Sequence, residues 1–122
     1  MKYKLVQKAN PQDKSKKWYA NAVNAGTVSQ RAVAKNIAEK SSLTVGDIAN
    51  VIENLLEEMP KELIEGKSVK LGDFGTFRLS LSSEGVGNEK DFNATKIKGA
   101  KVIFTPGMAL KKALSDIKYE RE

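Results

Sequence analysis

The first quarter of the chain has the pattern of two short strands separated by a polar segment. Residues 3–8 alternate between apolar and polar side chains, and residues 18–23 are rich in aromatic and apolar residues. Residues 10–17 between them contain Asn, Pro, Asp, Ser and Lys, a composition typical of a turn. We therefore predict a β-hairpin, which should pack against the rest of the chain because an isolated hairpin is marginally stable in water.

Two segments with helical spacing follow this hairpin. Apolar residues recur every three or four positions within residues 30–41, and Thr27 and Ser29 are both candidate N-caps for this helix. A second helix is expected to begin after Thr44 and to have a broad apolar face. We expect Pro60 to kink or interrupt the second helix, because proline lacks the N–H that an interior residue donates.

The period of the pattern then changes from that of helices to that of strands. Residues 68–71 and 76–82 alternate, and a turn rich in glycine separates them. A long polar segment covers residues 83–98, a strand is expected at 100–104, and a helix at 108–117. The predicted fold class is α+β, with the order hairpin, two helices, two strands, polar excursion, strand and helix.

Composition narrows the possible functions. The 122 residues include neither cysteine nor histidine, which excludes disulfides and thiolate zinc sites and removes the commonest general base. We therefore expect a binding protein rather than an enzyme, with no cofactor, no metal and no small-molecule substrate. The absence of a long apolar stretch and of a signal-peptide pattern leads us to expect a soluble cytoplasmic protein with no membrane partner.

Positive charge is concentrated at the start of the chain. The net charge is +6, and residues 1–29 hold six lysines against a single acid, Asp13. The remaining residues hold 15 basic and 14 acidic side chains, so they are close to neutral. An excess of positive charge of this kind favours a polyanionic partner.

Four local words carry a resemblance to a known family. They are Val-Ala-Lys-Asn-Ile-Ala-Glu-Lys at 33–40, Leu-Thr-Val-Gly-Asp at 43–47, Leu-Gly-Asp-Phe-Gly-Thr-Phe at 71–77 and Phe-Thr-Pro-Gly-Met-Ala-Leu-Lys at 104–111. The combination of the third and fourth words is specific, whereas either alone would be weak. Over about three quarters of its length the chain resembles the HU/IHF family of bacterial histone-like DNA-binding proteins, in a longer branch with an N-terminal extension.

The resemblance implies a fold and an assembly. It implies two helices, a three-stranded antiparallel sheet with a β-ribbon arm at about 83–99, and a short final helix, all within an HU-like domain at 29–122 that follows a basic extension at 1–28. It also implies an intertwined homodimer, since so small a domain cannot easily cover its own apolar residues. The candidate interface residues are Ile48, Val51, Ile52, Leu55, Leu56, Phe74, Phe77 and Phe104.

The same resemblance implies non-sequence-specific binding to double-stranded DNA in the nucleoid, which would compact or bend the duplex. Basic residues of the extension, the sheet, the arm and the last helix are the candidates for contacts with phosphates. The candidate DNA-binding residues are Lys8, Lys14, Lys16, Lys17, Lys70, Arg78, Lys90, Lys96, Lys98, Lys101, Lys111 and Lys112. The four candidate lysines of the extension flank Trp18 and Tyr19. The rings of these two residues could stack beside a phosphate or fill an apolar seam.

The arm departs from the usual pattern of the family. It resembles an arm that is normally rich in Arg and Lys and has a proline at its tip that wedges between base pairs. Residues 83–101 instead hold four lysines and three acids, with neither arginine nor proline. Val86 and Phe92 are candidate wedges, or they pack on the arm itself. An alternative function is therefore an HU-like dimer that serves as a protein-interaction or structural scaffold, with weak or no DNA binding.

Overall fold

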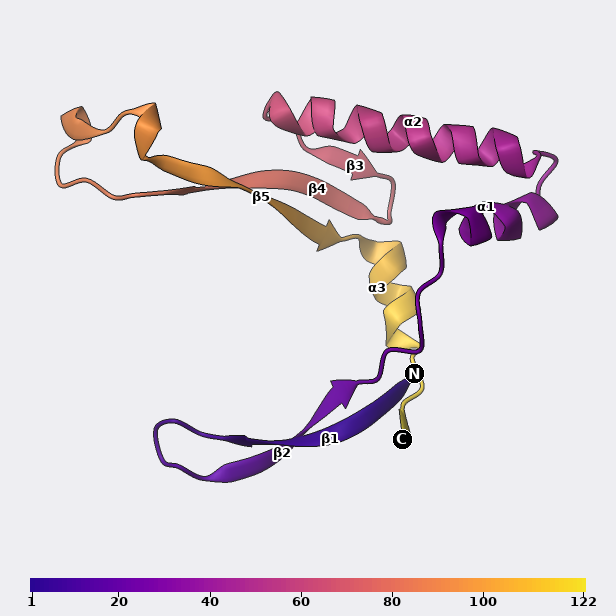
Figure 1. Ribbon diagram of the computed structural model, residues 1–122, viewed down its shortest axis with the longest axis horizontal. Helices are drawn as coiled ribbons and strands as arrows, with labels where there is room; N and C mark the ends of the chain where they lie inside the picture. The colour runs from indigo at the N-terminus through magenta and orange to yellow at the C-terminus, as the bar shows by residue number, and fades with distance from the viewer.

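A computed structural model describes residues 1–122, and the protomer has an open, C-shaped outline in which α3 connects two separate sheets (Figure 1). The elements, in chain order, are β1 (Lys2–Ala9), β2 (Lys16–Ala22), α1 (Gln30–Glu39), α2 (Val45–Ile64), β3 (Val69–Leu71), β4 (Gly75–Ser83), the 3-10 turns η1 (Glu89–Asp91) and η2 (Ala94–Lys96), β5 (Ile97–Pro106), α3 (Met108–Ser115) and β6 (Glu120–Arg121). The predicted α+β class and the order of the main elements are confirmed.

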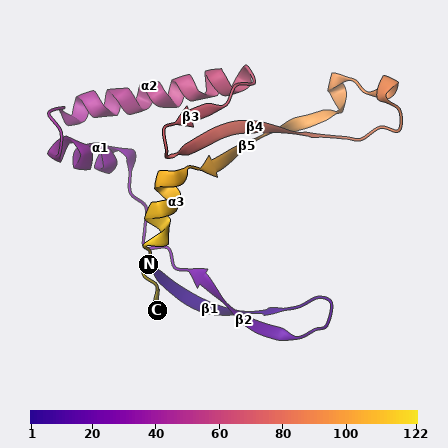
Figure 2. The ribbon, with the colours of Figure 1, turned by 180° about the vertical axis from the view of Figure 1, so that it is seen from behind.

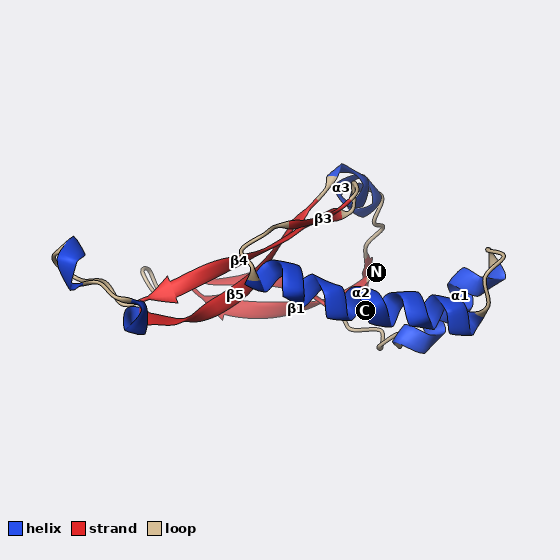
Figure 3. Cartoon of the chain, turned by 90° about the horizontal axis from the view of Figure 1, so that it is seen from above, coloured by secondary structure: helices blue, strands red, loops and turns tan.

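The β1–β2 hairpin and the β4–β5 ribbon extend to the same side of the molecule, as the front and back views agree (Figures 1 and 2). Seen from above, α1 and α2 lie at one end of the molecule and the turns at the tip of the ribbon lie at the other (Figure 3). The helical base and the tip of the β4–β5 ribbon are therefore at opposite ends of the molecule.

The predicted hairpin is one part of a sheet that joins the two ends of the chain. Its strands pair antiparallel from Tyr3 opposite Ala22 to Ala9 opposite Lys16. The C-terminal β6, which the sequence pattern does not predict, pairs parallel with β1, so the strand order is β2-β1-β6. The N–H of Glu120 donates to the carbonyl of Met1 at 3.0 Å. The hairpin is thus joined to the C-terminal segment through the two-residue strand β6, whereas β2 is exposed along its whole length.

Side-chain caps fix where the two helices of the base begin. Ser29, one of the two candidates, accepts a hydrogen bond from the N–H of Ala32 and caps α1. Thr44 caps α2, and Thr44 and Asp47 form a reciprocal capping box. These caps satisfy N–H groups that have no partner inside the helix.

An interruption at Pro60, one of the two expected outcomes, does not occur. The helix α2 continues through Pro60 to Ile64 and ends before Gly66, which has a φ of 87°. Proline costs this helix the hydrogen bond to the carbonyl of Leu56, and the Leu56 residue is 55% exposed, so water can reach this turn. The left-handed conformation of Gly66 is what stops the helix.

The second sheet has one apolar face and one polar face. Its order is β3-β4-β5, and the register places Val69, Phe77 and Phe104 side by side on one face. The neighbouring row, Lys70, Thr76 and Thr105, lies on the other face because successive side chains of a strand point in opposite directions. The apolar row continues along the ribbon through Leu79 opposite Val102 and Leu81 opposite Ala100.

Three phenylalanine rings and one glycine form the centre of this apolar face. The Phe104 ring centroid lies 5.4 Å from that of Phe74 and 4.7 Å from that of Phe77. A Cβ at Gly75 would collide with the Phe104 ring and with the backbone oxygen of Thr105. The segment 71–77 therefore has glycine at position 75 because the ring of Phe104, from the segment 104–111, occupies the space that a Cβ would need.

A second glycine, Gly107, packs against the segment 71–77. The N–H of Gly107 donates to the carbonyl of Phe74 at 2.8 Å, and the N–H of Ala109 donates to the carbonyl of Asp73 at 3.1 Å. A Cβ at Gly107 would meet the backbone oxygen of Asp73 far inside contact distance. The turn before β4 and the start of α3 are consequently one packed unit.

The single chain leaves much more surface exposed than a compact monomer of its mass does. Its accessible surface is 10287 Å², whereas a compact monomer of 13.4 kDa exposes about 6,500 Å². Only four of the 122 residues are buried: Ala34, Ile48, Leu63 and Gly75. Large apolar side chains on α2, such as Val51 at 61% exposed, face solvent in the single chain.

We predict that Gly107→Ala lowers the free energy of unfolding by about 1–3 kcal/mol, because the new methyl group forces the Asp73 backbone out of place. Urea unfolding at fixed protein concentration measures the change. Gly99→Ala is the matched control, since a Cβ at Gly99 meets nothing within 4 Å. Equal effects of the two substitutions would show that the close approach at Gly107 has no energetic role.

Candidate nucleic-acid interface

The polar face of the second sheet collects three of the predicted basic residues. Lys70 pairs with Thr76, Arg78 lies two residues further along β4, and Ser80 pairs with Lys101. Because side chains two residues apart share a face, Lys70, Arg78 and Lys101 all lie on the face opposite the phenylalanine rings. All three are exposed, and none has a carboxylate within 4.0 Å. The register thus places these three candidate residues on one face of the sheet, and their role in binding DNA stays a prediction.

The lysines of the arm are less available for an external anion. Lys96 pairs with Glu84 at 4.0 Å, and Lys90 lies in η1 between Glu89 and Asp91. Lys98 falls at the β-bulge between the pairs Ser82–Gly99 and Ser83–Ile97, where it has no partner in the register. The arm is therefore nearly neutral, and Lys98 is its most independent charge near the ribbon.

The tip of the arm consists of two short capped turns. Asn88 accepts a hydrogen bond from Lys90 N–H at the start of η1, and Asn93 accepts one from Thr95 N–H at the start of η2. Phe92 lies between the two turns and is 42% exposed, while Val86 is half-buried. The insertion of Val86 or Phe92 between base pairs stays a prediction.

One face of the hairpin carries a row of lysines around an aromatic ring. Lys8 lies directly opposite Lys17, and the Lys8 ammonium lies 5.7 Å from the centroid of the Tyr19 ring. Lys2 and Lys4 lie on the same face of β1 as Lys8, since residues separated by an even number of positions in a strand share a face. Lys2 and Lys4 are not among the candidates named from the sequence, although the period-two pattern of this strand places them beside Lys8.

The remaining residues of the extension divide between the other face and the turn. Lys16 and Trp18 lie on the face opposite Tyr19, because they alternate with Lys17 and Tyr19 along β2. Lys14 lies in the turn with a φ of 58°. The expected cluster of four lysines around both rings is therefore divided, with Lys8 and Lys17 beside Tyr19 and Lys16 beside Trp18.

Hydrogen bonds hold the turn that connects these strands. The hydroxyl of Ser15 donates to the Asp13 carboxylate at 2.7 Å, and the Ser15 N–H donates to it at 2.9 Å. These two bonds hold the pKa of Asp13 below its ordinary value. The Asn10 side chain likewise accepts from the N–H of Gln12. The turn is therefore shaped by its own side chains and keeps one negative charge beside the lysines.

The opposed lysines of the hairpin carry an electrostatic cost. Like charges directly opposite each other destabilise an antiparallel pair, and neither Lys8 nor Lys17 has an acidic partner within 4.0 Å. A phosphate placed between the two ammonium groups would remove this repulsion. This pair is the part of the extension best suited to an anion.

The predicted lysines of the last helix lie between the two sheets. Lys111 and Lys112 are exposed on α3 and line a shallow hollow together with Asp73, Met108 and Ala109. The carboxylate of Asp73 adds a negative group to this hollow. The surroundings of Lys111 and Lys112 therefore have mixed charge, unlike the basic face of the second sheet.

No three His, Cys, Asp or Glu side chains gather in a way that could hold a metal ion. None of the helices combines the length and the apolar character that crossing a membrane requires.

Comparison with known proteins identifies the family. A family model described as an HU domain fused to wHTH, Ig, or Glycine-rich motif, named HU-HIG, matches residues 1–121. The chain belongs to the HU-HIG family. The match includes the hairpin and β6, so the sheet that joins the two termini lies within the region that defines this family.

Curated relatives place the chain in the wider HU/IHF group. It is 38% identical over 86 residues to integration host factor subunit alpha of Colwellia psychrerythraea. The aligned region covers 69% of this chain and 89% of the relative. It is 33% identical over 87 residues to the corresponding subunit of Haemophilus influenzae, with 70% and 91% covered. The resemblance drawn from the sequence words is thereby confirmed.

Solved structures confirm the fold. A crystal structure of a protein from Bacteroides vulgatus matches 98% of this HU-HIG chain with a TM-score of 0.65 at 18% identity. This chain spans about half, 47%, of that protein. An Anabaena HU–DNA cocrystal structure matches 74% of this chain and 100% of the HU chain, with a TM-score of 0.55 at 21% identity. About a quarter of this chain thus has no counterpart in the Anabaena protein.

We predict that Lys17→Glu stabilises the hairpin, because it replaces the repulsion between Lys8 and Lys17 with an attraction across the strands. The melting midpoint followed by the fluorescence of Trp18, the only tryptophan, should rise at low salt. The gain should shrink in about 1 M salt, where charges are screened within about 3 Å.

Lys14→Glu is the control for this substitution, since Lys14 lies in the turn without a lysine opposite it. An equal rise for both variants, or a fall for Lys17→Glu, would contradict an electrostatic cost at this pair.

Proposed function

We propose that this chain is an architectural protein that binds double-stranded DNA as a homodimer, without sequence specificity, and compacts or bends the duplex. The observation that carries the proposal is the shared face of Lys70, Arg78 and Lys101, on a fold whose match in Anabaena HU was crystallised with DNA. The three side chains lack acidic partners, so their charge is available to phosphates.

The homodimer follows from the unburied surface of the protomer. The single chain exposes about 3,800 Å² more than a compact monomer of its mass, and an obligate interface of about 2,000–5,000 Å² in total would bury roughly 1,000–2,500 Å² of this excess on each copy. Of the proposed interface residues, Val51, Leu55, Leu56 and Phe74 are exposed in the single chain. Ile52, Phe77 and Phe104 are half-buried, and Ile48 is already buried within its own protomer. A second copy would cover the exposed members of this set.

The binding surface would use both ribbons of each protomer. The hairpin and the β4–β5 ribbon extend to the same side, so a duplex on that side would meet Lys8 and Lys17 as well as the basic sheet face (Figure 1). Residues 1–28 would act as a basic extension and 29–122 as the HU-like domain, with the arm at 83–99. The arm lysines, Lys14, Lys16, Lys111 and Lys112 would add phosphate contacts around this surface.

Recognition of this kind depends mainly on phosphate neutralisation. It involves no catalysis, cofactor or small-molecule substrate. Since the charge on the arm is nearly balanced, sharp bending would depend less on the arm than on the sheet and the hairpin. The activity would place the protein at the nucleoid in the cytoplasm.

Fluorescence anisotropy with a random-sequence duplex tests this function. Because the proposed surface holds more than four basic residues in each dimer, on the sheet faces as well as on the hairpins, affinity should fall by more than about 10²-fold between about 50 and 200 mM salt. The Lys8→Ala/Lys17→Ala variant should bind more weakly and show a slope of log K against log salt that is smaller by about 3–4, because each dimer then lacks four lysines that neutralise phosphates. Substitution is preferable to truncation here, because β1 is the central strand of its sheet.

Lys35→Ala/Lys40→Ala removes the same charge from exposed positions on and beside α1, at the opposite end from the ribbons, and should leave the slope unchanged. Absence of binding at the lower salt concentration would overturn the proposed function and favour the scaffold alternative. Equal slopes for the two double variants would remove the hairpin from the interface while leaving the sheet face in place.

A further inference from the structure

The outer edge of β2 is unpaired along all seven residues of the strand. All seven residues of β2, Lys16–Ala22, are exposed, and the strand pairs only with β1. The opposite edge of the same sheet is β6, which has two residues, Glu120 and Arg121, both charged. Short, charged edges resist pairing with another chain, whereas a longer edge with aromatic residues invites it.

The hydrogen-bond pattern shows which groups of β2 are free. The N–H of Asn10 donates to Ser15 and that of Val23 donates to Lys2, at 2.7 and 2.9 Å. Because bonded and non-bonded pairs alternate along an antiparallel ladder, the odd-numbered residues of β2 bond to β1. The N–H and C=O groups of the even-numbered residues therefore point outward. They are Lys16, Trp18, Ala20 and Ala22.

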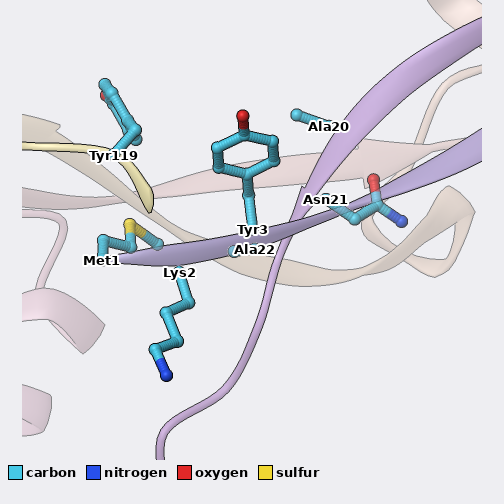
Figure 4. A pocket seen from close by; sticks show the side chains of 7 residues that line it. All are labelled: Met1, Lys2, Tyr3, Ala20, Asn21, Ala22 and Tyr119. Carbon is cyan, nitrogen blue, oxygen red and sulfur yellow. The ribbon is translucent and has the colours of Figure 1, made fainter. Parts of the chain in front are cut away.

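A pocket lies beside this edge, on the face that carries Trp18. It has a volume of about 460 Å³, and its lining includes Met1, Tyr3, Ala20, Ala22 and Tyr119. Figure 4 shows Tyr3, Tyr119 and Ala20 on one side of the sheet, while Lys2 points to the other side. The two alanines leave the floor of the pocket open next to the free edge. Trp18 itself is 64% exposed and does not line the pocket.

We propose that the free edge of β2 pairs with the β2 edge of a second copy of this chain, as a continuous four-stranded sheet of two hairpins. A twofold axis perpendicular to the sheet relates antiparallel strands of this kind, and the register centred on Tyr19 pairs all seven residues. The bonded pairs in that register are the even-numbered residues, whose groups point outward.

The side chains of this register are complementary in size and charge. Trp18 lies opposite Ala20 of the second copy and diagonal to its Ala22, so the indole enters the pocket beside those alanines. Lys16 lies opposite Ala22, and Lys17 lies opposite Asn21, so no lysine of β2 directly faces another across the new pair. The large side chain of each copy fills the space that the small side chains of the other leave.

The pairing leaves the lysine-bearing face accessible. Lys8 and Lys17 lie on the face opposite Trp18, and the two copies would present these lysines on the same side of the joined sheet. The hairpin lies away from the helix α2 (Figure 1), whose exposed apolar residues belong to the proposed dimer interface, so this contact is separate from that interface. A homodimer would have two such edges, so the contact would join dimers into larger assemblies.

A cysteine cross-link tests the pairing without DNA, which keeps it independent of the proposed binding function. The chain has no cysteine, so Tyr19→Cys introduces the only thiol. In the proposed register the two Cα atoms at position 19 form a non-hydrogen-bonded pair about 4.5 Å apart, within disulfide reach. Mild oxidation of the full-length protein should give a covalent pair of chains on a non-reducing gel.

Asn21→Cys is the matched control, on the same face of the same strand. Position 21 lies opposite position 17 of the second copy, so the two introduced thiols would be about 13 Å apart and should not cross-link. Adding Ala20→Pro to the Tyr19→Cys chain should abolish the cross-link, because proline removes an outward N–H while sparing the pairing with β1. Circular dichroism would check that the proline variant keeps its fold.

Light scattering of the cross-linked Tyr19→Cys protein should give a mass of at least four chains. Equal cross-linking of Tyr19→Cys and Asn21→Cys, or cross-linking of neither, would overturn the proposed pairing. A mass of two chains after cross-linking would overturn the joining of dimers. DNA binding by a chain that does not cross-link would reject this inference and leave the proposed function intact.

Discussion

The constraint on which the structure depends is that one chain cannot cover its own apolar surface. The protomer exposes 10287 Å² where a compact chain of its mass exposes about 6,500 Å². The helix α2 and the phenylalanine face of the second sheet supply much of the apolar part of this surface. A second copy of the chain can bury this apolar surface most simply, because each copy contributes the same apolar residues and every contact occurs twice about a twofold axis. With this cover, the basic face of the second sheet would remain accessible to a ligand.

Alternation along the strands then links stability to binding. In β4 and β5 one set of side chains packs around Phe104, and the intervening set presents Arg78 and Lys101 on the other face. The glycines at 75 and 107 fix this sheet against the start of α3, so the basic face is held by packed backbone. The hairpin is different, because opposed Lys8 and Lys17 weaken the strands that carry them. Such a cost is understandable if an anion relieves it.

Much of this arrangement was predictable from the sequence, since period-two and helical patterns reflect local geometry. The hairpin and the caps at Ser29 and Thr44 follow from spacing and residue type. The shared face of Lys70, Arg78 and Lys101 depends also on the register between the strands, which spacing does not give. The strand β6 was not predictable, because its two residues are both charged and show no alternating pattern. They form a strand only because they pair with β1. The continuation of α2 through Pro60 depends on solvent exposure, which spacing does not report.

The central claim is that a second copy completes the fold, and sedimentation combined with thermal unfolding tests it most directly. The account predicts a mass of at least two 13.4 kDa chains at micromolar concentration. It also predicts a melting midpoint that rises with protein concentration, because dissociation and unfolding are then coupled. A folded species of a single chain, with a midpoint independent of concentration, would contradict the account.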